Sequence, residues 1–455
     1  MEVKHCIIGA GPTGLGAAHR LRELGQESFV ILEKNAYPGG LSASFQDGQG
    51  FTWDVGGHVL FSHYPYFDRL VEGLLAGDFL EHQRESWVRA RDAWVPYPFQ
   101  NNIRHLPPEA RWECVRGLLP GRRPEARPAN FREWIECVFG RGIADIFMLP
   151  YNFKVWATPP ELMDFSWIGE RVSVVDLEGV LKNIILERDD VGWGPNNTFR
   201  FPLRGGTGEI FRRLARRVED KIRYGAGVVR VDAAARSVTT ANGEVVRYET
   251  LLNTGPLDLL VREWLADPDP ALVEAAGGLQ HNGVHVSGLG FASDRKDSRC
   301  WMYFPGQETP FYRLTNFHNY SPNNPPAPGL AALMCETSFS EHKPEDLAGI
   351  MGRTEDGLAA CGLLPEAERK AMASRWQMHV DYGYPVPSLT RDRALAAIQP
   401  RLEAQGLFSR GRFGGWKYEV GNMDHSVMQG VEWAERMVQN TPERTYALET
   451  HGNVR

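Results

Sequence analysis

The feature that most constrains the fold is the run Cys6–Gly14, where a short apolar segment leads into Gly-x-Gly-x-x-Gly and then into a helical pattern. A strand, a glycine-rich turn and a helix in this order direct backbone N–H groups and a helix N-terminus at a pyrophosphate. Gly9 permits the tight turn, Gly11 lets phosphate oxygens approach the backbone, and Gly14 lets the helix lie close to the strand. The candidate phosphate contacts are Gly9, Gly11, Pro12, Thr13 and Gly14.

A second apolar segment, Phe29–Leu32, ends in Glu33. An acid at the end of the second strand of such a unit hydrogen-bonds a ribose 2′-hydroxyl, which favours FAD or NAD over NADP. An incidental glycine turn is the alternative interpretation, and the complete series of strand, turn, helix, strand and acid disfavours it. The N-terminal region is therefore predicted to be a dinucleotide-binding α/β unit.

Composition limits the remaining possibilities. A chain of 455 residues exceeds what one core usually serves, so two or three domains are expected. The 50 basic and 57 acidic residues give a formal charge of −7, which offers no basic surface for nucleic acid. Six widely scattered cysteines without Cys-x-x-Cys spacing indicate neither a zinc site nor a disulfide framework, and no metal is expected.

The first apolar segment begins almost at the first residue, which leaves no room for a signal peptide. No apolar run approaches the roughly 20 residues that a membrane-spanning helix needs. We therefore expect a cytoplasmic protein without membrane insertion.

Two further glycine-containing segments follow Glu33. The first contains Gly40, Leu41 and Ser42, where paired glycines would let the chain lie against an extended cofactor, although a simple turn is the alternative. The second, Phe51–Phe61, is an apolar, strand-like run that contains Gly56, Gly57 and His58. Glycines inside such a run suggest the close approach of another planar body, for which a flavin ring is a candidate. His58 could tune flavin charge or could be an ordinary core histidine.

The middle of the chain is rich in aromatic residues. Pro96 and Pro98 favour an extended or edge-strand conformation around Tyr97. Asn130 and Glu133 form a capping pattern before a helix with apolar residues at helical spacing. The segment Tyr151–Trp156 could stack and hydrogen-bond a nucleobase or could be a buried helix end, and the sequence favours neither.

Beyond residue 193 the chain becomes glycine-rich and is expected to return to the dinucleotide domain. The alternating run Val228–Val231, followed by a turn at Asn242–Gly243, predicts a hairpin against which adenine could rest, with Val229 as a candidate contact. Short alternating segments near residues 284–286 and 289–291 predict an antiparallel sheet. Near the C-terminus, a glycine-containing turn feeds a helix N-terminus, as in sites that hold the polar edge of a flavin; its candidate contacts are Gly421, Asn422, Met423 and Ser426.

Four longer strings carry a resemblance to a known family: Asp54–His58 with Phe61–Tyr64, Pro96–Asn102, Tyr151–Trp156 and Arg412–Ser426. With these strings the chain resembles the UDP-galactopyranose mutase family, its eukaryotic-type branch in particular, from about residue 5 to about residue 437. The resemblance implies an α/β fold in which a Rossmann-like FAD-binding domain carries an inserted helical domain and an antiparallel β-sheet domain. The expected segments are 1–90, 193–256 and 396–455 for FAD binding, 91–103 and 257–395 for the sheet, and 104–192 for the helical domain.

The resemblance also implies a reaction. In this family, N5 of reduced FAD attacks the anomeric carbon of UDP-galactopyranose and expels UDP, and the covalent flavin–sugar adduct opens and recloses to give UDP-galactofuranose without net redox change. Arg171 and Arg313 match the family's diphosphate arginines, and Gly57 and His58 would lie near N5. Other matching positions imply substrate contacts; these are Tyr97, Phe99, Gln100, Tyr151, Asn152, Trp156, Asn196, Trp301, Tyr303, Tyr320, Tyr384 and Tyr418.

Arg84 and Arg412 match cations that eukaryotic-type members use for the phosphate of a reducing nicotinamide, so NADPH is the expected reductant. Met423 departs from the family pattern, in which a glutamine is expected, so a flavin contact there would come from the backbone. A UDP-sugar is the expected partner, and a homo-oligomer is possible.

Three other functions stay open. A mutase acting on another nucleotide hexose would use the same site. An FAD-dependent oxidoreductase of the amine-oxidase or desaturase kind shares the glycine fingerprint and Glu33, but has little use for two diphosphate arginines surrounded by tyrosines. The third alternative is a sugar-nucleotide-binding flavoprotein without catalytic activity.

Overall fold

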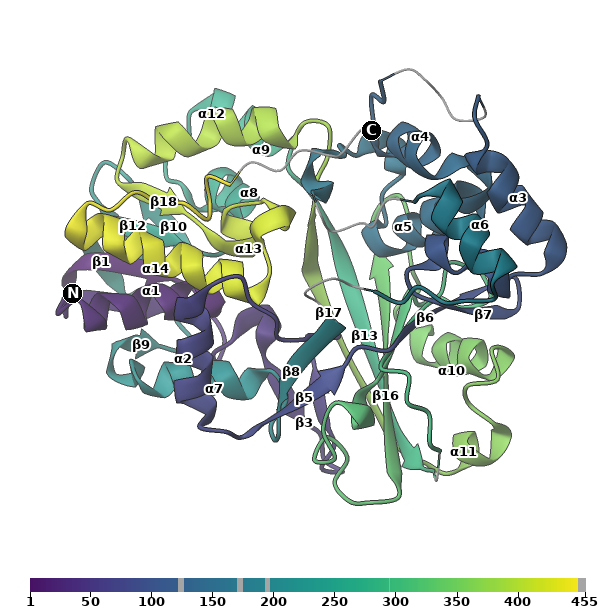
Figure 1. Cartoon of the computed structure of the whole chain (residues 1–455). Helices are drawn as coiled ribbons and strands as arrows, with labels where there is room; N and C mark the ends of the chain where they lie inside the picture. The colour runs from purple at the N-terminus through teal and green to yellow at the C-terminus, as the bar shows by residue number, and fades with distance from the viewer. Residues whose placement is uncertain (122–126, 170–174, 193–196, 294, 449–455) are drawn as a thin grey trace.

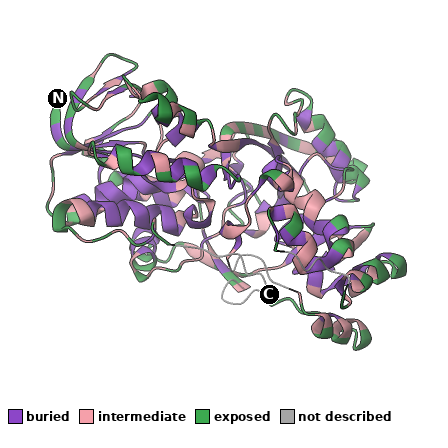
Figure 2. Cartoon of the chain, turned by 90° about the horizontal axis from the view of Figure 1, so that it is seen from above, coloured by how far each residue is buried: buried purple, intermediate pink, exposed green. Residues whose placement is uncertain are grey.

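The computed structural model describes residues 1–121, 127–169, 175–192, 197–293 and 295–448. It consists of two lobes, each built around a seven-stranded sheet (Figure 1). Buried residues fill the interiors of both lobes and exposed residues cover their outer surfaces (Figure 2).

The first sheet has the parallel core of a dinucleotide-binding domain. β1 pairs in parallel with β2 on one side and with β12 on the other, and β12 also pairs in parallel with β18. The strands of this sheet are β1 (Glu2–Ile8), β2 (Phe29–Leu32), β9 (Ile222–Arg223), β10 (Val228–Asp232), β11 (Ser237–Thr240), β12 (Val245–Asn253) and β18 (Leu407–Ser409).

Side chains alternate between the two faces of this sheet, as the period of a strand requires. Ile7, Phe29 and Ile31 face one helical layer, whereas Val30 and Leu32 face the other. The first layer contains α1 (Pro12–Glu23), α2 (Pro65–Leu75), α7 (Gly208–Arg216) and α14 (Met423–Gln439). The second contains α8 (Leu257–Leu259), α9 (Pro270–Ala276), α12 (Arg391–Glu403) and α13 (Gly411–Gly414).

The second sheet has the order β17-β13-β16-β15-β14-β6-β7. All its pairings are antiparallel except β14 with β6, which is parallel, so the predicted antiparallel sheet is in fact mixed. Its strands are β6 (Ser86–Ala90), β7 (Ala93–Pro96), β13 (Gln280–Ala292), β14 (Trp301–Tyr303), β15 (Arg313–Asn316), β16 (Leu330–Phe339) and β17 (Met372–Val386).

Helices cover both faces of the second sheet. The larger helical layer is α3 (Pro108–Leu118), α4 (Phe131–Ile143), α5 (Leu149–Trp156) and α6 (Leu177–Ile185), with a π-helical turn at Ala144–Met148 before α5. α10 (Ile350–Ala360) and α11 (Glu366–Lys370) lie on the opposite face (Figure 1). Two small ribbons pair β3 (Ser44–Gln46) with β4 (Thr52–Asp54) and β5 (Phe79–Gln83) with β8 (Thr198–Pro202).

The α/β fold class predicted from the sequence is confirmed, with local corrections. The two short segments expected near residues 284–291 are parts of one long strand, β13. The Asn242–Gly243 turn joins β11 to β12 rather than closing a hairpin with β10. The run after Phe51 is a strand only as far as Asp54, because the glycines that follow bend the chain.

Element membership also bears on the expected domain segments. β6 already belongs to the second sheet before residue 91. The helices between residues 257 and 279 share a core with the first sheet, although that stretch was expected in the sheet domain. The domain boundaries otherwise stay predictions.

Two local predictions elsewhere are confirmed, the helix cap at Asn130 and the edge strand beside Tyr97. The Asn130 side chain accepts a hydrogen bond from the Glu133 N–H at 3.0 Å and so caps α4. β7 is the edge strand expected beside Tyr97. All six cysteines lie within the described residues and are unpaired thiols. Among the described helices, none is both long and apolar enough to cross a bilayer.

Candidate active site

The glycine-rich turn between β1 and α1 has the geometry of a pyrophosphate cradle. Gly9 has φ +98°, and a Cβ on Gly14 would stand 1.9 Å from the Gly9 carbonyl oxygen, so neither position accepts a side chain without rearrangement. A Cβ on Gly11 would meet no atom within 4 Å, which leaves that side of the turn open to phosphate oxygens. The N-terminus of α1 begins here at Pro12 and Thr13, and its dipole favours an anion.

The other predicted cofactor contacts from this half lie around the same turn. Glu33, at the end of β2, accepts the Ala10 N–H at 2.7 Å, and the Gly39 N–H donates to the Ala10 carbonyl at 2.8 Å. The latter bond brings the short helical turn Gly40–Ser42, which includes Leu41, to the cradle. These residues therefore fit an FAD pyrophosphate and ribose. Val229 lies at an irregularity of β10 and is 50% exposed, so an adenine contact there would fall at the surface.

The predicted flavin-edge segment forms the start of α14. Asn422 is the N-cap residue and its carbonyl accepts the Ser426 N–H at 2.8 Å. Met423 is the first helical residue, and the Ser426 hydroxyl approaches the Gly421 carbonyl at 3.4 Å. The first-turn N–H groups of a long helix are thus available at the point where the polar edge of a flavin would need donors.

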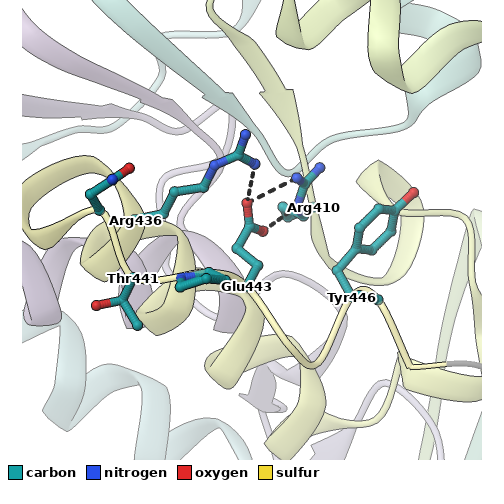
Figure 3. A pocket seen from close by; sticks show the side chains of 8 residues that line it. Arg410, Arg436, Thr441, Glu443 and Tyr446 are labelled. Carbon is teal, nitrogen blue, oxygen red and sulfur yellow. Dashed lines mark hydrogen bonds and ion pairs between the residues drawn. The ribbon is translucent and has the colours of Figure 1, made fainter.

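A C-terminal strap, Asn440–Tyr446, supports the chain that leads to this segment (Figure 3). Glu443 accepts hydrogen bonds from Arg410 Nε at 2.5 Å and from Arg436 Nη1 at 2.8 Å. The Arg410 guanidinium also lies 4.3 Å from the centre of the Tyr446 ring, and Lys417 donates to the Tyr446 carbonyl at 3.0 Å. Because Arg410 directly precedes α13, the strap holds the start of the chain that leads through α13 to the predicted flavin-edge segment.

At the centre of the site, Arg313 forms a cross-strand ion pair with Glu336. The two residues face each other in the β15–β16 register. Arg313 Nε donates to Glu336 Oε1 at 2.6 Å, and Nη2 donates to Oε2. The Gly57 N–H donates to Oε1 at 2.9 Å and the Tyr312 hydroxyl to Oε2 at 2.9 Å. One buried carboxylate thus connects Arg313, the predicted diphosphate arginine, to the glycine–histidine segment.

The surroundings of Glu336 and Arg313 keep both side chains charged. Burial opposes ionisation of Glu336, but the Arg313 charge and the hydrogen bonds together hold its pKa below the usual range. Burial also disfavours the Arg313 cation, but Glu336 outweighs this and raises the arginine pKa well above its ordinary value. Burial lowers the pKa of His58 to about 4, so its imidazole is neutral at neutral pH.

Gly56 and Gly57 lie against the Glu336 carboxylate, a neighbour that the expected flavin contact did not include. Gly56 has φ +102°, and a Cβ there would lie 3.1 Å from Glu336 Oε2. A Cβ on Gly57 would lie 2.8 Å from the Thr315 hydroxyl. The glycines therefore let the backbone bend onto Glu336 and bring His58 beside Arg313.

An aromatic wall continues from this pair. The Trp301 ring lies under two guanidinium groups, with Arg313 at 4.6 Å and Arg84 at 4.9 Å from its centroid. Tyr303 lies two residues further along β14. Its ring centroid is 5.4 Å from that of Tyr97 and 5.1 Å from that of Tyr151. The structure thus brings β14, β15, α5 and the residues after β7 together around one surface.

A second aromatic group closes the opposite side. Trp156 contacts Tyr418 at 4.8 Å, Tyr384 at 5.8 Å and Trp167 at 5.1 Å between ring centroids. Arg412 lies over both tyrosines, 4.9 Å from the Tyr384 ring and 5.4 Å from the Tyr418 ring. Both predicted NADPH cations, Arg84 and Arg412, are therefore stacked on predicted substrate aromatics.

The remaining predicted substrate residues differ in their burial and in their hydrogen-bond partners. Phe99 is buried against Phe147, and Gln100 is buried next to it. The Asn152 amide donates at 2.7 Å to the carbonyl of Met148, the last residue of the π-helical turn before α5. Tyr320 is buried among aromatic rings. Arg171 and Asn196 lie outside the described residues.

Several polar atoms of the wall fit a bound ligand. Within the described ranges, the buried side-chain atoms without a hydrogen-bond partner include four at this site: His58 Nδ1, Trp301 Nε1, Thr315 Oγ1 and the Tyr320 hydroxyl. Buried polar atoms are rarely left in this state without a ligand or water to satisfy them. Their position beside Arg313 fits an anionic, hydroxyl-rich substrate.

The sequence analysis missed several participants. Glu336 left a signal, because an acid inside the apolar run of β16 is unusual unless it is paired. Trp167 and Tyr312 left none beyond their aromatic character. His63, Asp424 and His425 also come together, and the Asp424 carboxylate interacts with Nδ1 of His63 at 2.9 Å and of His425 at 3.0 Å. No metal-ligand spacing in the sequence indicated this group.

Comparison with known proteins agrees with this geometry. The profile of the flavin containing amine oxidoreductase family matches residues 12–438. A crystal structure of reduced UDP-galactopyranose mutase superimposes with a TM-score of 0.94 and 44% sequence identity, covering 98% of this chain and 96% of that one. The chain belongs to the UDP-galactopyranose mutase branch of the flavin-containing amine oxidoreductase family.

More distant relatives share parts of this architecture. A putative protoporphyrinogen oxidase from Exiguobacterium sp. 255-15 has a TM-score of 0.72 at 16% identity and covers 96% of this chain and 99% of that one, which shows a common fold. A 15-cis-phytoene desaturase from Glycine max is 33% identical over 84 residues, which are 18% of this chain and only 15% of that relative. The family members differ in chemistry, so function depends on the site.

Proposed function

We propose that this chain is a flavin-dependent mutase that interconverts UDP-galactopyranose and UDP-galactofuranose. The observation that carries the proposal is the Arg313–Glu336 pair, placed beside Gly57 and His58 and surrounded by tyrosine and tryptophan rings, in a chain 44% identical to a UDP-galactopyranose mutase along almost its whole length. A cation and aromatic walls at one point suit a departing nucleoside diphosphate and a sugar that must be shielded from water.

FAD fits the cradle at Gly9–Gly14, the Glu33 carboxylate and the start of α14, and in its reduced form it would supply the nucleophile for the anomeric carbon without net redox change. Arg313 would bind the diphosphate. Glu336 accepts one hydrogen bond from Nε and one from Nη2, which leaves both N–H groups of Nη1 and the second of Nη2 as donors for phosphate oxygens. Neutral His58 keeps an unpaired Nδ1 that could hydrogen-bond to the cofactor or to a sugar hydroxyl.

The aromatic groups divide between the two ends of the substrate. We assign uridine recognition to the residues around α5 and the turn after β7: Tyr97, Phe99, Gln100, Tyr151, Asn152 and Trp156. We assign the diphosphate and sugar to Arg313 and the described residues near it, which are Trp301, Tyr303, Tyr320, Tyr384 and Tyr418. The family resemblance adds Arg171 and Asn196, which lie outside the described residues. The observed ring contacts between Tyr151 and Tyr303 support one continuous binding surface.

We further propose NADPH as the reductant. The stacked guanidinium groups of Arg84 and Arg412 offer planar donors for a nucleotide phosphate at the edge of the site. Rapid anaerobic bleaching of the flavin by NADPH, slowed in an Arg84→Ala variant, would support this assignment, and reduction by NADH at the same rate would oppose it. A cytoplasmic location and a homo-oligomeric state stay predictions for cell fractionation and light scattering.

Two related functions differ from the proposal in measurable ways. A mutase for another nucleotide hexose would use the same diphosphate site with other hydroxyl contacts. An oxidoreductase, which the wider amine oxidoreductase family makes the main competitor, would consume an oxidant for each product.

The test is anaerobic incubation of dithionite-reduced protein with UDP-galactofuranose, followed by chromatographic separation of the nucleotide sugars. UDP-galactopyranose should appear with the reduced protein and not with an oxidised control. Failure of reduced, flavin-loaded protein to convert this substrate would overturn the assignment of galactose and direct the search to other nucleotide hexoses.

A further inference from the structure

Lys154 is a buried cation that no step above uses. It lies on α5, is only 2% exposed, and points its ammonium group into the loop between β14 and β15. Nζ donates to the Gly306 carbonyl at 2.7 Å, to the Thr309 carbonyl at 2.9 Å and to the Thr309 hydroxyl at 3.0 Å. An ammonium group has three donors, so these three uncharged oxygens satisfy it completely.

The loop that encloses the Lys154 ammonium group joins β14 to β15, two strands that carry residues assigned to the diphosphate and sugar. β14 carries Trp301 and Tyr303, and β15 begins with Arg313. The Phe304 N–H donates to the Tyr312 carbonyl at 3.0 Å and closes the base of the loop. Within the loop, the Thr309 hydroxyl donates to the Phe311 carbonyl at 2.9 Å. The Lys154 ammonium therefore forms the interior of the turn that aligns the two strands.

Lys154 connects this loop to the last turn of α5, which is itself anchored to the second sheet. Helices end with carbonyl groups that lack partners in the helix, and here side chains from the second sheet supply them. Asn282 of β13 donates to the Val155 carbonyl at 2.8 Å, and Ser338 of β16 donates to the Lys154 carbonyl. α5 is thus fixed to the sheet beside β16 (Figure 1), and one turn earlier Tyr151 contacts Tyr303.

We propose that Lys154 is a positioning residue that sets the spacing between the uridine-contacting helix α5 and the strand pair that carries Trp301, Tyr303 and Arg313. Its ammonium form holds both parts of the UDP site in register, and its neutral form releases the β14–β15 loop. This inference rests on the proposed function, because it assigns uridine and diphosphate to these two elements.

The charge state of Lys154 is sensitive to pH near neutrality. Burial lowers its pKa to about 7, although Glu308 of the same loop acts in the opposite direction. Lys343, beyond β16, lowers the pKa further, whereas Cys361, after α10, and Glu345 raise it. A neutral amine has two N–H donors for three acceptors, so one oxygen of the loop loses its partner as the pH rises. The affinity for UDP-galactopyranose should therefore fall between about pH 6 and pH 8.5.

The test compares oxidised, flavin-loaded wild type with Lys154→Met, and uses the dissociation constant of UDP-galactopyranose between pH 6 and 8.5. The diphosphate of this ligand does not titrate in that range. The wild-type dissociation constant should rise about tenfold across the range, whereas the variant should bind about tenfold more weakly at pH 6 and show no slope. Lys343→Met removes a neighbouring, partly buried cation and serves as the matched control. It should keep the tenfold fall in affinity but move its midpoint to higher pH, because the Lys343 charge lowers the Lys154 pKa.

A second variant keeps the proposal testable if Lys154→Met does not load flavin. Thr309→Val removes one acceptor of the ammonium group and should shift the fall in affinity to lower pH. Wild-type affinity and slope in a flavin-loaded Lys154→Met protein, or an unchanged midpoint in Thr309→Val, would overturn the positioning role. Absence of UDP-galactopyranose binding to the wild type would instead overturn the proposed function.

Discussion

Two fully buried carboxylates, one in each half of the molecule, have opposite electrostatic surroundings. Asp54, beside the cofactor cradle, accepts hydrogen bonds from the Ser44 hydroxyl and the Thr207 N–H, and burial raises its pKa to about 6 despite these donors. Glu336, in the substrate half, faces the Arg313 guanidinium, and its pKa is lowered even though burial opposes ionisation. Uncharged hydrogen-bond donors allow a buried carboxyl group to keep its proton more readily than in water, whereas a neighbouring cation keeps the carboxylate ionised.

The difference reflects what each half is built to hold. Backbone N–H groups and helix termini surround the predicted cofactor, so that half needs few fixed charges of its own. The half proposed to bind the substrate places a buried anion against a buried cation, which fixes the guanidinium where the proposed diphosphate would bind. Four substitutions should test this contrast.

The largest effect is expected from Arg313→Ala. It removes the cation proposed to bind the diphosphate and leaves Glu336 buried without its charge partner, so kcat/KM should fall about 10³-fold, or about 4 kcal/mol. Steady-state conversion of UDP-galactofuranose measures the loss. The double variant Arg313→Ala/Glu336→Gln should recover stability but not activity. Recovery of activity in the double variant would show that the cation is not needed.

The second effect concerns Asp54 and pH. Its folded pKa of about 6 lies above the ordinary value of 3.8, so the folded state holds the proton more tightly than the unfolded chain. This contribution to stability is complete below the unfolded value and disappears as the pH rises through about 6. In urea unfolding between pH 4 and 7.5, the wild type should lose about 2 kcal/mol more than Asp54→Asn. Parallel curves for the two proteins would contradict the assignment.

A smaller effect is expected from Glu336→Gln, which keeps the shape of the side chain but removes its charge. Because Glu336 acts by orienting Arg313, kcat should fall about tenfold while KM does not rise, since the freed guanidinium still binds the diphosphate. Tyr312→Phe, which removes only the hydroxyl donor to Glu336, is the matched control and should change kcat much less. An increase in KM without loss of kcat would argue against an orienting role.

The smallest effect is expected from Glu443→Gln in the C-terminal strap. It weakens the support of Arg410, at the start of the chain that leads to the predicted flavin-edge segment, so FAD should dissociate about fivefold more readily, a cost of about 1 kcal/mol. Flavin absorbance after dialysis measures retention. Glu435→Gln changes an acid on α14, shortly before the strap, that pairs with Arg20 instead of Arg410, and this variant should retain flavin normally. Equal loss from both variants would indicate a general weakening of α14.

The same contrast explains how far the sequence alone could lead. The cradle, Glu33 and the cap of α4 are formed by neighbours in the chain, so spacing was enough to predict them. Glu336 and Lys154 act through partners distant in sequence: Glu336 faces Arg313 across two strands, and Lys154 reaches a loop about 150 residues away. The local sequence around Glu336 or Lys154 does not indicate which distant residues are their partners. The mixed pairing of β14 with β6 was missed for the same reason, because it joins two separate segments of the chain.

The measurement that tests the central claim most directly counts turnovers against reducing equivalents. Protein reduced once and then freed of excess reductant under anaerobic conditions is given UDP-galactofuranose, and product per bound flavin is determined together with the flavin spectrum. The account predicts many molecules of UDP-galactopyranose per flavin while the flavin stays reduced. Product limited to one molecule per flavin, accompanied by flavin oxidation, would contradict it and identify an oxidoreductase.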